Sequence, residues 1–251
     1  MPVRTGDGAG IGGFILQGTA PRNIIVRAIG PSLNVDGRLV EGRLRDPELI
    51  LYDRDGKIIA INDNWRSSQE AQIRESGIAP LDDKEAAILM RLEPDNYTAV
   101  IRGAGETTGI GLIEIYDLES GETARLANIS TRGVVEDGDS ILIGGFILQG
   151  GATQKLLVRA IGPHLTSRGV PGALQDPTVE LRDSNGVLLM QNDNWKQNQR
   201  TEIEATGIPP NVDSESALLI ALSSGNYTAT VSGKDDTTGV ALIEVYNLGN
   251  P

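Results

Sequence analysis

The chain has 251 residues, which at about 100–200 residues per domain fits one large domain or two small ones. Its 22 lysines and arginines against 34 aspartates and glutamates give a net charge of −12, which argues against binding to nucleic acids or anionic membranes, because both need a basic surface. It has no cysteine and one histidine, His164, which excludes disulfides, thiolate metal sites, cysteine nucleophiles and a histidine-rich metal site within one chain.

The predicted elements of the first half are almost all strands. The start, MPVRTGDGAG, lacks the apolar core of a signal peptide, and no run reaches the roughly 18 apolar residues of a membrane span. The Asp-x-x-Gly turn at 53–56 lies between apolar runs and predicts a hairpin. Gly77 is placed as a helix-capping glycine, which predicts a helix over 67–76. Apolar patterning predicts strands over 24–29, 48–52, 58–61, 96–101 and 111–116.

The second half repeats the first. GGFILQG stands at 12–18 and again at 144–150, and NDNW stands at 62–65 and 192–195. LIEIYDL at 112–118 matches LIEVYNL at 242–248. The second copy accordingly predicts a DSNG hairpin and a helix over 197–206. We therefore expect two all-β domains, 1–121 and 122–251, each a jelly-roll-like β-sandwich with one short helix.

One segment has no counterpart in the first copy. Residues 124–132, ARLANISTR, precede the second copy and are patterned as a short strand. The first copy therefore lacks a strand and is expected to carry an open sheet edge, which can accept a strand from another chain. The alternatives are a shortened chain or a strand that the fold never needs. The predicted contact strands cover residues 3–15 and 126–129, with Val3, Ile11, Phe14, Leu126 and Ile129 as contact residues.

The NDNW segments suggest a metal site with a structural alternative. They place three oxygen-bearing side chains in a row, and an aspartate stands at each preceding turn. Calcium prefers such carboxylate and amide oxygens, but the same residues form Asx turns and helix caps. The candidate calcium ligands are Asp53, Asn62, Asp63 and Asn64 in the first copy and Asp183, Asn192, Asp193 and Asn194 in the second.

The two tryptophans, Trp65 and Trp195, occupy the same position in each copy. An exposed indole could stack on a sugar ring, whereas an indole closing one end of the core is expected where aromatics are scarce. Both interpretations stay open at this point.

Catalytic patterns are missing from the sequence. Arg27 and Arg159 alternate with apolar residues in strands, and Glu114 and Glu244 stand in the closing strands. These are expected to form structural ion pairs rather than the carboxylate pair of a glycoside hydrolase. There is no G-x-S-x-G elbow, and His164 is expected in a surface loop. We predict no catalytic residues and no enzyme activity.

The second half of each copy resembles the β-sandwich of bacterial pre-peptidase C-terminal domains. The resemblance lies in a strand, a D-x-x-G turn, the NDN segment, and then a NYTA strand and a closing strand. With RLANISTRG, IGGFI and RAIGP, the whole repeat also resembles uncharacterised modules near the C-termini of large secreted bacterial proteins. The resemblance implies an accessory domain located outside the cell.

The expected function follows from these observations. We expect an extracellular structural protein that associates with itself through strand edges, as a fibre or surface-layer subunit. The alternative is a calcium-dependent carbohydrate-binding or adhesion module of a larger secreted protein, with surface polysaccharide as partner. Calcium is the one cofactor considered.

Overall fold

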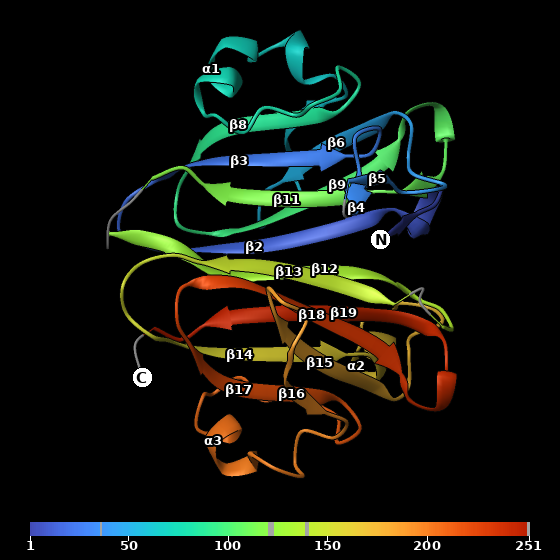
Figure 1. Cartoon of the computed structure of the whole chain (residues 1–251), viewed down its shortest axis with the longest axis vertical. Helices are drawn as coiled ribbons and strands as arrows, with labels where there is room; N and C mark the ends of the chain where they lie inside the picture. The colour runs from blue at the N-terminus through green and yellow to red at the C-terminus, as the bar shows by residue number, and fades with distance from the viewer. Residues whose placement is uncertain (36, 120–122, 139–140, 250–251) are drawn as a thin grey trace. The chain divides into compact units, whose positions relative to one another are not determined.

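The computed structural model describes residues 1–35, 37–119, 123–138 and 141–249. The chain divides into unit 1, Met1–Ala127, and unit 2, Asn128–Pro251. The division falls inside a strand rather than at the expected position after residue 121. Strands dominate both units (Figure 1), which confirms the all-β sandwich.

Unit 1 consists of two antiparallel sheets. One has the order β2-β9-β6-β7 and the other the order β11-β3-β8. A two-residue strand, β1, pairs with β10. The strands are β1 (Pro2–Val3), β2 (Gly10–Gly18), β3 (Arg22–Ile29), β4 (Asn34–Val35), β5 (Arg38–Leu39), β6 (Pro47–Tyr52), β7 (Ile58–Asn62), β8 (Ala86–Leu92), β9 (Asn96–Gly103), β10 (Gly109–Ile110) and β11 (Leu112–Asp117); the helices are α1 (Glu70–Glu75) and the 3₁₀ turns η1 (Gly6–Gly8), η2 (Trp65–Ser67) and η3 (Ala104–Glu106).

Unit 2 repeats this plan with one full strand more. Its sheets have the orders β12-β19-β14-β17 and β13-β18-β15-β16. The elements are β12 (Ala124–Val135), β13 (Leu142–Leu148), β14 (Gln154–Ile161), α2 (Pro163–Ser167), β15 (Pro177–Asp183), β16 (Leu188–Asn192), α3 (Arg200–Glu204), β17 (Ser216–Leu222), β18 (Gly225–Gly233), η4 (Lys234–Asp236) and β19 (Gly239–Asn247).

The predicted hairpin turns are present and have the same cause in both units. The Asp53 carboxylate accepts hydrogen bonds from the backbone N–H groups of Asp55 (3.0 Å) and Lys57 (2.9 Å). Gly56 adopts φ 75°, a left-handed conformation that glycine takes without a steric cost. The Asp183 carboxylate does the same between β15 and β16. The Asx-turn interpretation of these two aspartates is therefore confirmed.

The GGFILQG repeat lets the two sheets of each unit pack closely. A Cβ atom on Gly12 of β2 would lie 3.1 Å from Ile113 of the opposite sheet, and Gly144 stands in the same relation to Ile243. Phe14, two residues further along, is buried and stacks on Tyr97 at 5.2 Å between ring centroids. The glycine thus makes room for an isoleucine from the facing sheet, and the phenylalanine fills the core beside it.

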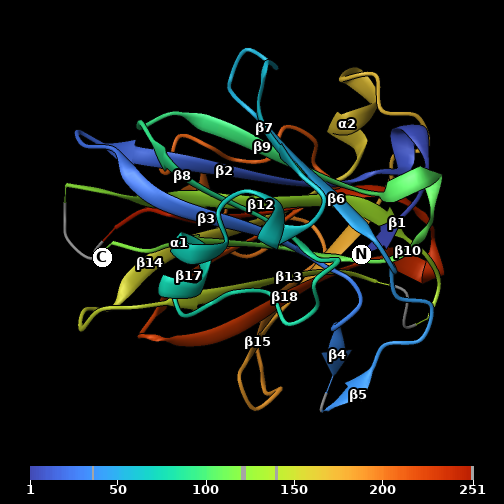
Figure 2. The same cartoon turned by 90° about the horizontal axis from the view of Figure 1, so that it is seen from above.

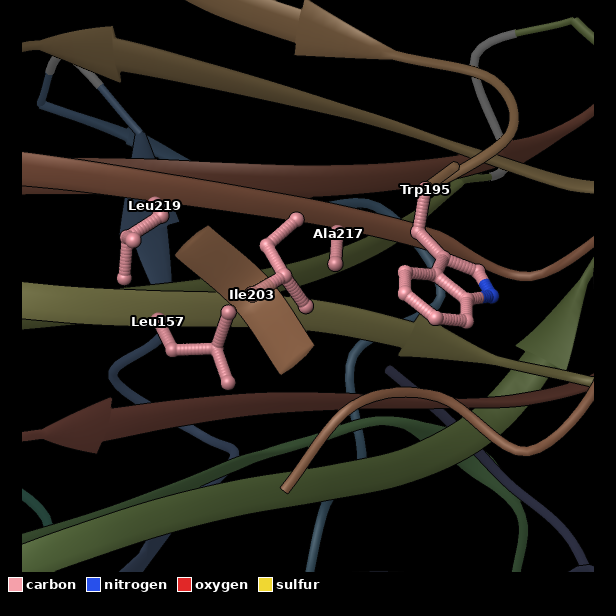
Figure 3. Close-up of a cluster of buried hydrophobic side chains, with 5 residues drawn as sticks. All are labelled: Leu157, Trp195, Ile203, Ala217 and Leu219. Carbon is pink, nitrogen blue, oxygen red and sulfur yellow. The ribbon is translucent and has the colours of Figure 1, made fainter. Parts of the chain in front are cut away.

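A second apolar layer covers the outer face of one sheet in each unit. In unit 2 it contains the buried Leu157, Trp195, Ile203, Ala217 and Leu219. Figure 3 shows Ile203 of α3 lying against the strand residues, with the indole of Trp195 at one end. Unit 1 has the equivalent cluster around Trp65 and Ile73. The short helix therefore closes the outer face of the sheet.

The helices differ from the prediction in length and number. The helix expected over 67–76 is only α1, Glu70–Glu75, because the Gln69 side chain bonds the backbone of Leu89 in both directions, at 2.7 and 3.1 Å, and this residue stays outside the helix. The one expected over 197–206 is only α3. Unit 2 also contains α2, which was not expected. Unit 1 has the hairpin β4–β5 in its place, and this hairpin stands apart from the other labelled strands of its unit in Figure 2.

Candidate functional site

The strand β11 is held firmly on its inner side. It pairs antiparallel with β3, so that Glu114 lies opposite Arg27. Arg27 forms an ion pair with Glu114 and also donates to the carbonyl of Ile78. The Tyr116 hydroxyl donates to Glu114 at 2.9 Å, and the Arg27 guanidinium lies 5.2 Å from the Tyr116 ring centroid. These contacts confirm the expected structural ion pair.

Unit 2 contains the same arrangement on β19. Arg159 donates to Glu244 at 3.0 Å and to the carbonyl of Ile208 at 2.7 Å. Tyr246 donates to Glu244 at 2.9 Å. Burial, and next the nearby Glu244 carboxylate, raise the pKa of Tyr246 to about 12. Each carboxylate is thus occupied by an arginine and a tyrosine, an arrangement that fixes the strand.

The outer sides of β11 and β19 differ. In unit 2, residues 128–135 of β12 pair along β19, from Asn128 opposite Tyr246 to Val135 opposite Gly239. The Asn128 amide also donates to the carbonyl of Val245 at 3.2 Å. In unit 1 the equivalent strand is β1, which among the described residues pairs with β10. The expectation that this strand is missing is therefore corrected: its last two residues are present.

The pairing of unit 1 ends at Gly111. The Met1 amino group donates to the Gly111 carbonyl at 2.9 Å, and the Gly111 N–H donates to Met1 at 3.0 Å. Backbone groups alternate between the two sides of an antiparallel strand, so those of Ile113 and Ile115 point to the same outer side as Gly111. Within the described part of the chain, β11 is the end strand of its sheet. The open edge of unit 1 is thus residues 112–116, which we call the β11 edge.

The side chains on the β11 edge are less covered than their counterparts. Ile243, Glu244 and Val245 are 2%, 9% and 7% exposed, whereas Ile113, Glu114 and Ile115 are all half-buried. Leu112 is 38% exposed, in part because its counterpart Leu242 packs on the α2 cluster that unit 1 lacks. Among the described residues, no strand pairs with the outer side of residues 112–116, and these side chains are less buried than those at 242–246.

A second edge lies at β13 in unit 2. In the described residues β13 ends its sheet, pairing with β18. Its outward residues Ile143 and Ile147 are each 55% exposed. Exposed apolar residues on an end strand favour pairing with other chains.

The candidate calcium ligands take part in protein hydrogen bonds. The buried Asn62 amide donates to the Asn64 carbonyl at 3.0 Å, and its oxygen accepts from Ala87 N–H at 3.0 Å. Asn192 makes the same bonds to Asn194 and Ala217. The Asp193 carboxylate accepts a hydrogen bond from the Lys234 ammonium group at 2.7 Å, while Asp63 is exposed.

The helix caps expected from the NDNW residues are corrected. Asn64 precedes η2 but makes no side-chain cap bond, and the residues at the N-cap positions of α1 and α3 are Gln69 and Gln199. The described residues contain no group of three or more histidine and acidic side chains able to hold a metal ion. Calcium binding stays a prediction.

The sugar-stacking role of the tryptophans is corrected. Trp65 and Trp195 are 1% and 4% exposed, and their indole N–H groups donate to the carbonyls of Asp82 (3.0 Å) and Val212 (3.2 Å). Arg66 and Arg74 lie over the Trp65 ring, at 4.9 and 5.0 Å from its centroid. Neither ring has a face open to a ligand, so both belong to the core.

The predicted assembly residues surround the open edge but do not form it. Val3 and Phe14 are 1% exposed, which removes them from any contact surface. Ile11 is half-buried in β2. Leu126 and Ile129 lie in β12, where Ile129 already pairs with Val245. The exposed edge is β11. The sequence pattern did not identify it, because the strand order of the sheet is needed to know that β11 is the end strand.

Sequence reasoning also missed two fully buried glutamates, Glu85 and Glu215. Glu85 accepts from the N–H groups of Gly30 (3.2 Å) and Ser32 (2.9 Å). Their signal was available, since Asp-x-Glu stands at 83–85 and again at 213–215. They explain the repeated RAIGP segment, whose loop amides they bind.

Comparison with known proteins gives no assignment. No protein family and no curated protein matches the sequence, so the resemblance to pre-peptidase C-terminal domains stays a prediction. Among solved structures, the PBCV-1 virus capsid is 10% identical over 98% of this chain and 91% of that chain, with a TM-score of 0.21. The infectious bursal disease virus VP2 subviral particle is 10% identical over 100% and 70%, with a TM-score of 0.18. Likenesses this weak carry no argument.

Within the described residues, no helix has both the length and the apolar character to cross a membrane.

Proposed function

We propose that the chain is a non-catalytic structural protein of the cell exterior that associates with itself through strand edges. The observation that carries the proposal is the β11 edge. The same position in unit 2 is covered by residues 128–135, whereas in unit 1 no described residue pairs with the outer side of residues 112–116.

Sheet edges are strong binding surfaces because each unpaired N–H and C=O group is a ready partner for another strand. Natural proteins usually protect such edges with charges, prolines or bulges. The β11 edge has Ile113 and Ile115 at the positions with free backbone groups, and its one central charge, Glu114, is engaged by Arg27. The edge therefore lacks this protection.

Further support comes from the chemistry of the repeat. The carboxylates that could have formed a catalytic pair, Glu114 and Glu244, are each bound to an arginine and a tyrosine. The extracellular placement rests on the resemblance to secreted modules. A polysaccharide-binding role is less well supported, because neither tryptophan is exposed for stacking on a sugar ring.

Sedimentation velocity over a concentration series tests the proposal. We expect species that grow with concentration, with and without a calcium chelator alike if association uses only strand edges. Growth that disappears with chelator would place calcium at the contact. A single species near 27 kDa at every concentration would contradict self-association.

A further inference from the structure

The strand β7 of unit 1 carries an apolar patch on an end strand. In the described part of the chain β7 ends its sheet, with β6 as its neighbour. Ile58 lies opposite Tyr52 and Ile61 lies opposite Ile50. Because residues two apart on a strand point to the same side, Ile58 and Ile61 share one face, where they are 46% and 55% exposed. We call residues 58–61 the β7 edge.

Unit 2 has the same hairpin with a polar surface at this place. The equivalent residues of β15 and β16 are Glu180, Arg182, Leu188 and Gln191. The Arg182 guanidinium forms an ion pair with the Glu180 carboxylate at 2.7 Å. The hairpin therefore forms without an apolar patch, so folding alone does not require the exposed isoleucines of unit 1.

We propose that the β7 edge pairs with the β7 edge of a second copy of this chain, antiparallel and about a twofold axis. This inference deepens the proposed function and rests on it for self-association, while placing a contact at β7. In this pairing Ile58 of each copy lies opposite Ile61 of the other. Both copies thus bury the same two side chains, as a symmetric contact requires.

A bulge in β7 favours a second copy as the partner. The pairing with β6 skips Ile59, so three residue steps from Ile58 to Ile61 cover the length of two steps on β6. A regular strand can match one of these isoleucines but is out of register at the other. A second β7 carries the same extra residue, so both Ile58–Ile61 pairs form together. Residues 58–62 contain no charge and no proline that would oppose this pairing.

The charges at the two ends of β7 are complementary in the same register. Lys57 precedes the strand and Asp63 follows it, and both are exposed. Among the described residues, neither side chain has an ion-pair partner. In the proposed register Lys57 of each copy comes within one residue of Asp63 of the other. Unit 2 lacks this pair of charges, because Val187 replaces the lysine and Asp193 is bound by Lys234.

Disulfide trapping tests the register directly, because the chain has no cysteine. Chains carrying Ile58→Cys are mixed with tagged chains carrying Ile61→Cys and oxidised. We expect mixed dimers, since Cα atoms of opposite residues are about 4.5–5.5 Å apart and a disulfide spans about 4.4–6.8 Å. Either variant alone should give far fewer dimers, because equal positions of the two copies lie diagonally, about 7–8 Å apart. Leu81→Cys, at an exposed position, is the control for random collision.

Charge variants test the two ends of the contact. Lys57→Asp and Asp63→Lys each bring like charges together at both ends, so the dissociation constant from sedimentation at low salt should rise about tenfold. The double variant restores opposite charges and should return the constant to within about twofold of the original. Glu202→Lys changes the net charge as much as Asp63→Lys but lies on α3, and it should have little effect.

The outcomes separate this inference from the proposed function. Mixed disulfide dimers and rescue by the double charge variant would support the β7 contact. A chain that associates but gives neither result would overturn this contact and leave association through β11 or β13. Dimers that form through β7 and grow no larger would support the inference and contradict association through β11. A chain that stays monomeric and forms no mixed disulfide would contradict both.

Discussion

At the residue scale, the buried glutamates are the most constrained groups of the chain. Glu215 accepts from the N–H groups of Gly162 (3.3 Å), His164 (2.9 Å), Asn211 (3.1 Å) and Val212 (3.1 Å). His164 donates only its backbone N–H to Glu215, whereas Ser32 at the equivalent position also donates its hydroxyl to Glu85 at 2.6 Å. A buried acid of this kind joins two loops to the sheet.

The substitution Glu215→Gln should lower the free energy of unfolding of unit 2 by about 3 kcal/mol. The amide replaces one acceptor oxygen with a donor that faces backbone N–H groups, and hydrogen bonds to a charged acceptor are each worth about 1.5–3 kcal/mol. Urea unfolding followed by Trp195 fluorescence measures the effect. Glu202→Gln, exposed on α3, is the control and should change stability by less than about 0.5 kcal/mol. Equal effects would contradict the role of Glu215.

Tyr246 makes the stability of unit 2 fall at alkaline pH. In the unfolded chain a tyrosine ionises near pH 10, whereas in the folded chain the pKa of Tyr246 is about 12. Between these values the folded state holds the proton that the unfolded state has lost, so stability is intact below pH 10 and falls as the pH rises towards 12. Tyr246→Phe should remove part of this loss, measured as unfolding midpoints from pH 9 to 12. If the Tyr246→Phe variant lost stability with pH as steeply as the original chain, Tyr246 would not be the cause of the loss.

At the element scale, β11 and β19 form an internal control for each other. Ile115 and Val245 are equivalent, but only Val245 faces a paired strand, opposite Ile129. Proline removes the N–H group and is tolerated on open edges. Val245→Pro should therefore destabilise its unit by about 1–3 kcal/mol more than Ile115→Pro does. Equal costs in urea unfolding would show that the Ile115 N–H is paired as well.

The β13 edge makes a separate prediction. Because Ile143 and Ile147 point outward and are largely exposed, replacing both with lysine should leave the fold intact and reduce any association that uses this edge. Sedimentation velocity measures the association and circular dichroism the fold. Leu81→Lys, at another exposed apolar position, is the control; the same reduction in both variants would exclude a specific edge effect.

How far the sequence predicts these elements depends on whether the cause is local. The Asp53 and Asp183 turns are local and were predicted, as was the repeat itself. The early start of a helix at residue 67 was wrong, because Gln69 is held by a strand distant in sequence. The position of the β11 edge depends on strand order. The presence of α2 in unit 2 where unit 1 has β4 and β5 depends on a small length difference between the copies. Neither signal is present in a local pattern.

At the scale of the whole molecule, each unit has its own core and its own tryptophan. Among the described residues, no strand lies along β11 as β12 lies along β19, so unit 1 of this chain buries less apolar surface at this edge. Trp65 fluorescence in a Trp195→Phe chain should therefore report unfolding at a lower denaturant concentration than Trp195 in a Trp65→Phe chain. The reverse order would contradict the weaker first unit.

Residue-resolved hydrogen exchange is the most direct test of the open edge. In a dilute solution, the amides of Ile113 and Ile115 should exchange much faster than those of Ile243 and Val245, because only the latter face β12. At concentrations where the chain associates, the two β11 amides should become protected. Equal protection of both pairs in dilute solution would mean that β11 has no open edge, and the account of its association would be wrong.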